Sequence, residues 1–361
     1  MEKKNQHYLP KFYFRFFSNN EKDICIFNMD NKQHFVGPFK NQSSEDYFYF
    51  HGSELENAFE KLEHSQREAL NKLIKARNFK TLSHEEYIEI LRFIAFQDTR
   101  TNYAKRGVNE MTQHLVREYV KPKMLQDEEL NKKVTKEDIL NVNLTYPADH
   151  LISIGIGLES PILLSDLIPI LLINKTELEF LFSDNPIVLY NLFFYRDKFE
   201  SHIGFQSPGL MVFCPLSKNL CLLLFDSKFY ELEGTKENLL EINDSNDIGK
   251  INKLQLYRCD KNIYYSDKCQ RGNVDKMFSD FSKTNSKREE VTKFEKLKVL
   301  NKPNSEILMV GERNIPEDIG LSFLKTKKVD GEISKIRKPE LVEIFNSFLR
   351  KAKEEGKTSG V

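Results

Sequence analysis

The tightest constraint on the fold comes from short apolar runs in the second half of the chain. Residues 178–182 and 187–189 are apolar at nearly every position, which is typical of a strand buried on both faces. Further strand candidates follow at residues 210–214, 220–225 and 262–266. Strands of this kind need other elements to cover the two faces of their sheet.

The first half of the chain supplies those elements. Residues 1–50 are expected to be β-rich, because aromatic side chains crowd residues 8–17 and a strand candidate follows at residues 24–28. From residue 53 to residue 170 the period becomes helical, and Ser83 and Glu86 form a capping box ahead of an apolar stripe. The sequence therefore predicts an α+β fold over residues 1–282. In it, the N-terminal strands and those of residues 177–270 form one central mixed or antiparallel sheet, and the helical middle packs on that sheet.

Residues 283–361 are predicted to form a C-terminal extension that ends in a helix. Pro339 fits the first turn of that helix, and its apolar stripe comprises Leu341, Ile344, Phe345, Phe348 and Leu349. We expect the stripe to dock on the core. The alternative is a helix that binds a membrane surface or a partner protein.

Charge and hydropathy exclude some classes of protein. Lys plus Arg and Asp plus Glu both number 54, so a surface that binds nucleic acid over its whole extent is not expected, although a local basic patch would fit. The N-terminus lacks the apolar segment of a signal peptide. The longest apolar run, at residues 162–173, is too short and too interrupted to span a bilayer. The sequence predicts a cytoplasmic protein without a membrane partner.

Two polar clusters in the first half interrupt apolar contexts and are candidates for a functional site. His7 precedes the aromatic stretch, and histidine titrates nearest to neutral pH, so it could act as a general acid or base. Gln97, Arg100 and Thr101 share a helix face at the end of a buried stripe, where an arginine meets a carboxylate, a carbonyl or a phosphate. The alternatives are a histidine bonded to the backbone and a structural arginine paired with an acidic group or a helix end.

A third cluster, Ser183-Asp184-Asn185-Pro186, separates the apolar runs at residues 178–182 and 187–189. These residues favour an Asx-type turn, and Pro186 moves Asn185 out of helical conformation. A solvated loop is the simplest interpretation, yet groups at the end of a buried strand are held rigidly. We therefore expect Asp184 to face a pocket. A fourth segment, at residues 214–217, fits a plain hairpin turn.

No cofactor follows from the sequence. Glu56, Glu60 and Glu63 lie on one helix face and could bind a divalent cation together with Asp184, but a solvated helix flank is the more typical reading. Nucleotide-binding, zinc-protease and serine-hydrolase motifs are absent, and the glycines at residues 155 and 157 are too isolated to form a phosphate loop.

Taken together, the clusters resemble a bacterial family known as a domain of unknown function, number 4238 in that series. Its members carry motifs like HYVP(R/K)FYLR, QxxRT, (L/I)TSDNPV and PLSP, in that order. The matching segments here are residues 7–15, 97–101, 182–187 and 215–217. Phe182 and Lys218 depart from the pattern, where the family has Thr and Pro. The resemblance implies that the motifs converge in one site, and it suggests a role in phage defence or as a toxin-like effector.

Two functional hypotheses follow. In the first, the protein is a nuclease-like hydrolase of a phosphate-containing substrate, either a nucleic acid or a nucleotide. Its catalytic residues would be His7, Asp184 and Arg100, and its substrate-binding residues Gln97, Thr101, Ser183 and Asn185. His7, Arg100 and Asp184 are then expected within about 8 Å of one another. In the second, the protein is a non-catalytic sensor or interaction protein, and the same residues form a structural polar network.

Overall fold

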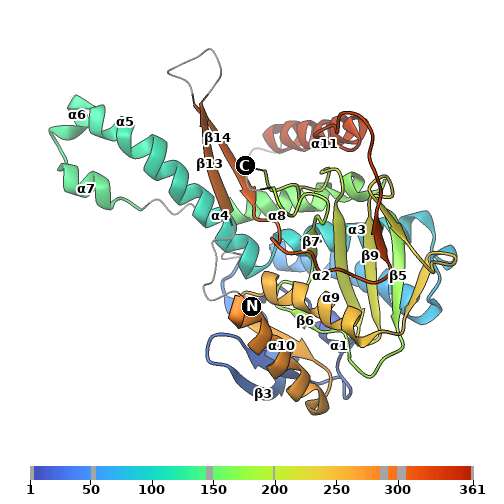
Figure 1. The fold of residues 1–361 in the computed structure, drawn as a ribbon. Helices are drawn as coiled ribbons and strands as arrows, with labels where there is room; N and C mark the ends of the chain where they lie inside the picture. The colour runs from blue at the N-terminus through green and yellow to red at the C-terminus, as the bar shows by residue number, and fades with distance from the viewer. Residues whose placement is uncertain are drawn as a thin grey trace.

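The computed structural model shows an α+β fold built on two main sheets (Figure 1). It describes residues 4–49, 54–143, 149–197, 200–284, 292–298 and 306–358. The predicted fold class is confirmed, with helices concentrated in the middle of the chain and strands before and after them.

The larger sheet has five strands and is buried on both faces. Its strands are β5 (Ile168–Asn174), β7 (Val188–Tyr190), β8 (Met211–Ser217), β9 (Leu220–Phe225) and β11 (Leu239–Ile242). The order is β11-β5-β9-β8-β7, and the pairing is antiparallel except between β11 and β5. Alternate residues of β8 and β9 enter two separate hydrophobic cores. This is why these runs are apolar at every position rather than at every second one.

The smaller sheet joins the N-terminal strands to the second half of the chain. It contains β2 (Asp23–Asn28), β3 (Gln33–Pro38), β6 (Phe182–Ser183) and β12 (Asn262–Tyr265), in the order β3-β2-β12-β6. The expectation of one central sheet was therefore wrong, although N-terminal strands do pair with strands from the second half. The residues between β6 and β7 carry the chain from one sheet to the other, because Pro186 lacks the amide hydrogen that a continuous ladder needs.

Helices fill the middle of the chain as predicted. The main ones are α2 (Glu54–Ala76), α3 (His84–Thr99), α4 (Asn102–Leu115) and α8 (Asp149–Glu159). The capping box at the start of α3 is present, with Ser83 and Glu86 each accepting the other's amide. The helical pattern expected up to residue 170 ends early: a short 3-10 turn (Pro161–Leu164) leads into β5, whose apolar residues lie inside the larger sheet.

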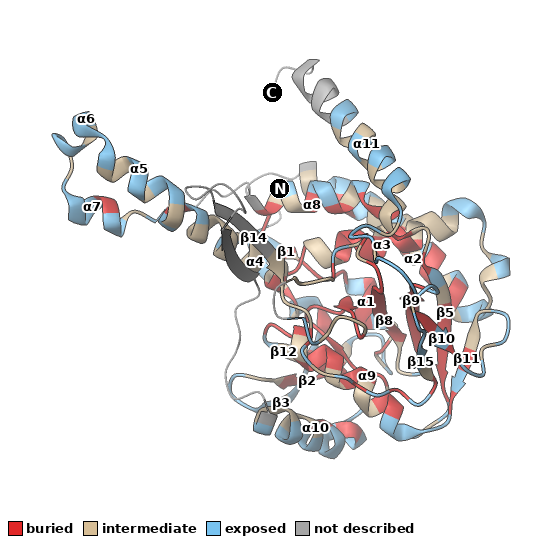
Figure 2. Ribbon diagram, turned by 45° about the horizontal axis from the view of Figure 1, so that its top comes forward, coloured by how far each residue is buried: buried red, intermediate tan, exposed pale blue. Residues whose placement is uncertain are grey.

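A helical arm extends from the body at residues 102–141 (Figure 1). It comprises α4, a π-helical turn (Val116–Val120), α5 (Lys121–Gln126), α6 (Glu128–Asn131) and α7 (Lys136–Asn141). Most of its residues are exposed or half-buried (Figure 2). Within the described part of the chain, no helix is both long enough and apolar enough to cross a membrane.

The aromatic stretch at residues 8–17 differs from the prediction, because it contains a helix instead of a strand. Helix α1 (Lys11–Arg15) begins after Pro10 and buries the aromatic residues at positions 12–14. The strand before it, β1 (Asn5–His7), pairs with β4 (Ser44–Asp46) rather than with either main sheet. Pro10 fixes an extended conformation that suits a helix N-cap, and Lys11 and Arg15 then lie one turn apart on the exposed face.

Elements from the second half of the chain cover the sheet faces that the middle helices leave open. Helix α9 (Ser245–Arg258) covers the second core of the larger sheet, and α10 (Arg271–Thr284) packs with α9 beside the smaller sheet. Strand β10 (Tyr230–Leu232) pairs with β15 (Leu324–Thr326), and β13 (Thr292–Lys298) pairs with β14 (Glu306–Glu312). Residues 315–323 contribute four apolar side chains to the second core, so this part of the predicted extension belongs to the body.

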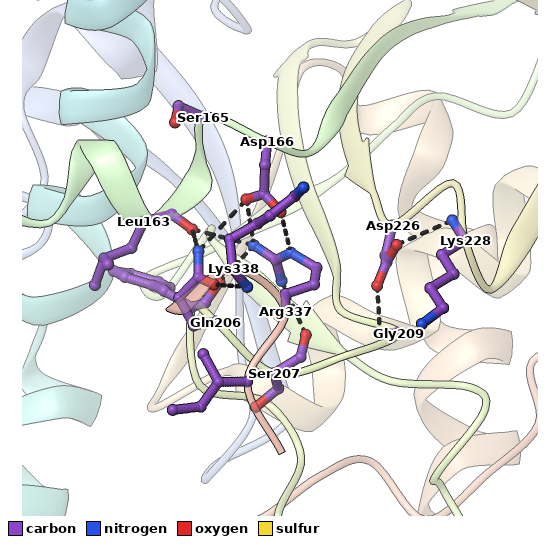
Figure 3. A network of polar contacts seen from close by, with 12 residues as sticks. Leu163, Ser165, Asp166, Gln206, Ser207, Gly209, Asp226, Lys228, Arg337 and Lys338 are labelled. Carbon is purple, nitrogen blue, oxygen red and sulfur yellow. Dashed lines mark hydrogen bonds and ion pairs between the residues drawn. The ribbon is translucent and has the colours of Figure 1, made fainter. Parts of the chain in front are cut away.

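An arginine fixes the chain just before the terminal helix (Figure 3). Arg337 donates two hydrogen bonds to the Asp166 carboxylate, at 2.6 and 2.8 Å, and others to the backbone oxygens of Leu163, Phe205 and Ser207. Its side chain is only 6% exposed. This bidentate pair anchors the start of the last helix to the body.

The terminal helix α11 (Pro339–Thr358) forms as predicted but docks only in part. It contacts the 3-10 turn at residues 161–164 and α8, and then runs away from the body (Figure 2). Ile344 and Phe348 of the apolar stripe remain 41% and 40% exposed. The expected docking of the whole stripe was therefore wrong, because Leu341, Phe345 and Leu349 are only half-buried while Ile344 and Phe348 face solvent.

Candidate functional site

The Gln97–Thr101 segment, at the end of α3, joins the N-terminal motif to α2. The Gln97 side-chain amide donates to the Tyr8 carbonyl at 2.9 Å and accepts from Arg100 Nε at 2.9 Å. Arg100 also donates to Glu63 Oε1 at 2.9 Å and lies 4.5 Å from the centre of the Phe96 ring. Gln97 and Arg100 are at most 1% exposed. Their observed partners are protein groups, in place of the substrate contacts expected for them.

Thr101 connects this segment to the turn between the two sheets. Its hydroxyl donates to Asn185 Oδ1 at 2.9 Å and accepts from the Ala104 amide, which caps α4. The Ser183 hydroxyl donates to the Asn185 carbonyl at 2.8 Å, and the Ser183 amide donates to Gln255 Oε1 at 2.9 Å. Thr101, Ser183 and Asn185 are thus buried and bonded to the protein itself, again in place of the expected substrate.

Asp184 holds the connection between α9 and β12. One carboxylate oxygen accepts the Asp260 amide at 2.7 Å, and the other accepts the amides of Lys261 and Asn262 at 2.7 and 3.0 Å. The pKa of Asp184 is raised to about 6, chiefly by burial and also by the nearby Asp260 carboxylate, while the three amide bonds act in the opposite direction. Asp184 is 1% exposed, and it was expected to face a pocket. Instead it serves as a turn-closing acceptor.

Contacts between motifs show that the matched segments do converge. Tyr8 meets Gln97 as described, the Tyr13 hydroxyl donates to the Pro215 carbonyl, and Thr101 meets Asn185. The prediction of a plain hairpin turn at residues 214–217 was wrong, because these residues are the end of strand β8 and pair with β9, and the turn follows them. The polar residues of the second and third motifs form a network that is sealed from solvent. The N-terminal motif borders this network and is open to solvent on its other side.

That open side is a cleft of about 370 Å³ between β1, α1 and α2. Helix α1 presents Lys11 and Arg15, which are one turn apart. Helix α2 presents a stripe of four polar side chains at helical spacing: Glu60, Glu63, His64 and Arg67. His7 belongs to the cleft wall, whereas Asp184 is not among its lining residues. The structure therefore brings His7 together with Glu63, and through Glu63 with Arg100.

One ring nitrogen of His7 contacts a backbone carbonyl. The Nε2 atom lies 2.8 Å from the Lys40 carbonyl oxygen. A carbonyl can only accept, so Nε2 carries a hydrogen and donates it to this oxygen. The Tyr49 hydroxyl donates to the His7 carbonyl at 3.1 Å and fixes the strand beneath the ring. These two contacts hold the imidazole of His7 in place at the wall of the cleft.

Three cations face the cleft without a carboxylate partner in the described part of the chain. Lys11 forms no ion pair there, Arg15 lies 5.8 Å from the Phe39 ring centre, and Arg67 donates to His64 Nδ1 at 2.9 Å. Glu63, by contrast, is already neutralised by Arg100. Cations without a carboxylate partner on both walls of a concave surface produce a local positive potential, which favours the binding of an anion.

The sequence prediction missed most of the cleft residues. Lys11, Arg15, His64 and Arg67 were not candidates, and Glu60 and Glu63 were considered as metal ligands or, more typically, as a solvated helix flank. Their spacing was a usable signal, because positions 11 and 15 share one helix face, as do positions 60, 63, 64 and 67. Which other helix they would face could not be read from that spacing.

The divalent-cation site suggested by the sequence has no support in the described residues. Both oxygens of Asp184 are occupied by backbone amides, and Glu63 is paired with Arg100. The side chain of Glu56 lies outside the described residues. Across the described ranges, no group of three or more His, Cys, Asp or Glu side chains is arranged to hold a metal ion.

One buried amide near the cleft yields a prediction about stability. Gln66 lies in the apolar stripe of α2 and is fully buried, and neither of its amide atoms has a hydrogen-bond partner among the described residues. Gln66→Leu should raise the free energy of unfolding by about 1–3 kcal/mol, because a buried polar group without a partner carries that desolvation cost. Urea unfolding of both proteins measures the change.

The exposed Gln126 at the end of α5 supplies the matched control. Gln126→Leu should change the free energy of unfolding by no more than about 0.5 kcal/mol, as is usual for surface substitutions. A loss of stability in Gln66→Leu would show that the amide makes a favourable contact, and the interpretation would then be wrong.

Comparison with known proteins gives a family for the chain. The family model described as "Protein of unknown function (DUF4238)" matches residues 5–269. No curated protein and no solved structure matches. The matched region includes the cleft, the sealed polar network and both main sheets. The chain therefore belongs to the DUF4238 family of proteins of unknown function.

Proposed function

We propose that the protein is a hydrolase that acts on a phosphate-containing substrate, a nucleotide or a nucleic acid, in the cleft between α1 and α2. The observation that carries the proposal is the presence of a histidine beside three cations without carboxylate partners among the described residues. Phosphate binding needs such cations, and hydrolysis needs a base for the attacking water. A role in phage defence or as a toxin-like effector remains a prediction.

The proposed roles follow from the contacts. His7, whose Nε2 is held by the Lys40 carbonyl, serves as the base that takes a proton from the attacking water. Lys11, Arg15 and Arg67 bind the phosphate oxygens and offset the negative charge that develops during attack. The carboxylate of Glu60 lies on the same wall as Arg67 and also lines the cleft.

The buried residues are proposed to position the cleft rather than to touch substrate. Arg100 donates a hydrogen bond to Glu63, and Gln97 links Arg100 to the carbonyl of Tyr8, the neighbour of His7. Asp184 anchors the connection between α9 and β12, and Asn185 accepts a hydrogen bond from Thr101. These contacts fix the turn that joins the two sheets. In this proposal Arg100 is a positioning residue, because Glu63 stands between it and the open cleft.

Phosphate release from small substrates tests the proposal. The purified full chain would be assayed with nucleotides, single-stranded and double-stranded nucleic acids, p-nitrophenyl phosphate and bis(p-nitrophenyl) phosphate. His7→Ala should lower activity about 10²–10⁴-fold, the usual contribution of a positioned general base, without lowering the melting temperature. The control is His84→Ala, at an exposed histidine at the start of α3. Equal activity of the two variants would contradict the role of His7.

A non-catalytic sensor is the second candidate. It is favoured by the burial of six of the seven candidate residues predicted from sequence, all of which are bonded to protein groups. A sensor would bind an anion in the same cleft and release no product. Saturable binding of inorganic phosphate to wild type, with no turnover of any substrate above, would support the sensor and reject the hydrolase.

A further inference from the structure

The number of cations in the cleft bears on the kind of phosphate it fits. Lys11 and Arg15 come from α1 and Arg67 comes from α2, and none has a carboxylate partner in the described ranges. A phosphate monoester has three non-bridging oxygens and is largely a dianion at neutral pH. A diester has only two such oxygens and one charge. Three separate cations therefore match the charge and the oxygen count of a monoester better.

The size and the other charges of the cleft argue against a long polyanion. A volume of about 370 Å³ lies near the lower end of the range for small-molecule sites, roughly 300–1,000 Å³. Apart from Lys11, Arg15 and Arg67, the described residues that line the cleft include no lysine or arginine, so a second phosphate beside the first would find no further cation. The chain has a net charge of zero, which supplies no general attraction for a nucleic-acid backbone.

The aromatic residues of the cleft offer little surface for stacking. Phe12, Tyr49 and Phe59 line it, but they are only 5%, 3% and 6% exposed. Recognition of a base by stacking requires an open ring face. The contacts available to a ligand are therefore concentrated on its phosphate, and the group attached to that phosphate is held weakly.

From these observations we infer that the reacting phosphate is a terminal monoester, on a free small molecule or at the end of a strand. The inference rests on the proposed function. Water oxygen forms a bond to phosphorus while one of its protons passes to the imidazole of His7. The phosphorus–oxygen ester bond breaks, its electron pair stays on the leaving oxygen, and His7 returns the proton there. The products are inorganic phosphate and an alcohol, and no other reactant is needed.

Two chromogenic substrates separate this inference from the proposed function. The full chain should hydrolyse p-nitrophenyl phosphate with a kcat/KM at least about tenfold above that for bis(p-nitrophenyl) phosphate, a difference equivalent to one good charged contact. Inorganic phosphate should inhibit competitively. Arg15→Ala and Lys11→Ala should each lower kcat/KM for the monoester about 10- to 100-fold. Lys22→Ala, at an exposed lysine outside the cleft, should leave it unchanged.

The possible outcomes are distinct. His7-dependent hydrolysis that favours the diester would overturn the monoester inference and leave the proposed hydrolase standing. If neither substrate is hydrolysed, nor any nucleotide, both fail. An Arg15→Ala variant as active and as sensitive to inorganic phosphate as Lys22→Ala would show that these cations do not bind the phosphate, and the inference would again be wrong.

Discussion

Replacing Asp184 with alanine should lower the free energy of unfolding by about 2–4 kcal/mol, because three amides lose a charged acceptor and water does not fully replace it. Asp184 is 1% exposed and accepts the amides of Asp260, Lys261 and Asn262. Without it, the connection from α9 to β12 loses its anchor. Chemical denaturation followed by circular dichroism measures the change.

Two further variants make this prediction specific. Asp184→Asn keeps the shape of the side chain but turns one acceptor into a donor that faces an amide hydrogen, so it should also destabilise. Asp280→Ala removes an exposed carboxylate paired with Lys283 on α10 and should change stability by no more than about 0.5 kcal/mol. An Asp184→Ala protein that is fully stable but inactive would show that Asp184 is catalytic.

The same residue gives the prediction a pH dependence. The pKa of Asp184 is about 6 in the folded protein, above the ordinary value of 3.8, chiefly because of burial. A carboxyl whose pKa is raised on folding contributes stability that is fully present below the unfolded pKa and is lost as pH rises through the folded one. The stability advantage of wild type over Asp184→Ala should therefore be larger at pH 4.5 than at pH 7.5. Unfolding of both proteins across this range measures it.

Alanine at Gly157 should lower the free energy of unfolding by about 1–3 kcal/mol, the usual cost of overpacking. A Cβ atom there would collide with the Thr99 side chain and lie 2.9 Å from the Ala95 carbonyl oxygen of α3. The Thr99 side chain can rotate, but the helix backbone at Ala95 cannot move without separating α3 from α8. Thermal and urea unfolding would both report the loss.

The neighbouring glycine is the matched control. A Cβ atom at Gly155 would have no neighbour within 4 Å, so Gly155→Ala should raise stability by about 0.5–1 kcal/mol through helix propensity alone. If Gly157→Ala lowers the free energy of unfolding and Gly155→Ala raises it, the contact between α3 and α8 lies at Gly157. If Gly157→Ala also stabilises, the close approach of these helices in the structure is not maintained in solution.

The apolar runs and the turn between them show which structural features could be predicted from local sequence. Residues of β8 and β9 alternate between two cores, which accounts for their continuous apolar character. The turn at Asp184 was placed correctly as a break between strands. Its flanking strands, however, belong to different sheets, and a strand pattern reports burial without identifying its partner.

The first aromatic stretch was misread because two preferences conflict there. Aromatic residues favour strands, but Pro10 and the four-residue spacing of Lys11 and Arg15 favour a helix. Burial of Phe12, Tyr13 and Phe14 against both sheets and α3 decided in favour of the helix. The cleft exists because that helix turns its two cations towards α2.

The sequence by itself determined the α+β class, the helical middle, the capping box at Ser83 and the set of polar motifs, because each depends on neighbours within a few residues. Only the tertiary structure decided which polar residues are sealed and which are open. Arg100 and Asp184 are closed in by partners 37 and 76–78 residues away in the chain. Short-range patterns contain no information about such partners, so burial and cleft formation follow from packing alone.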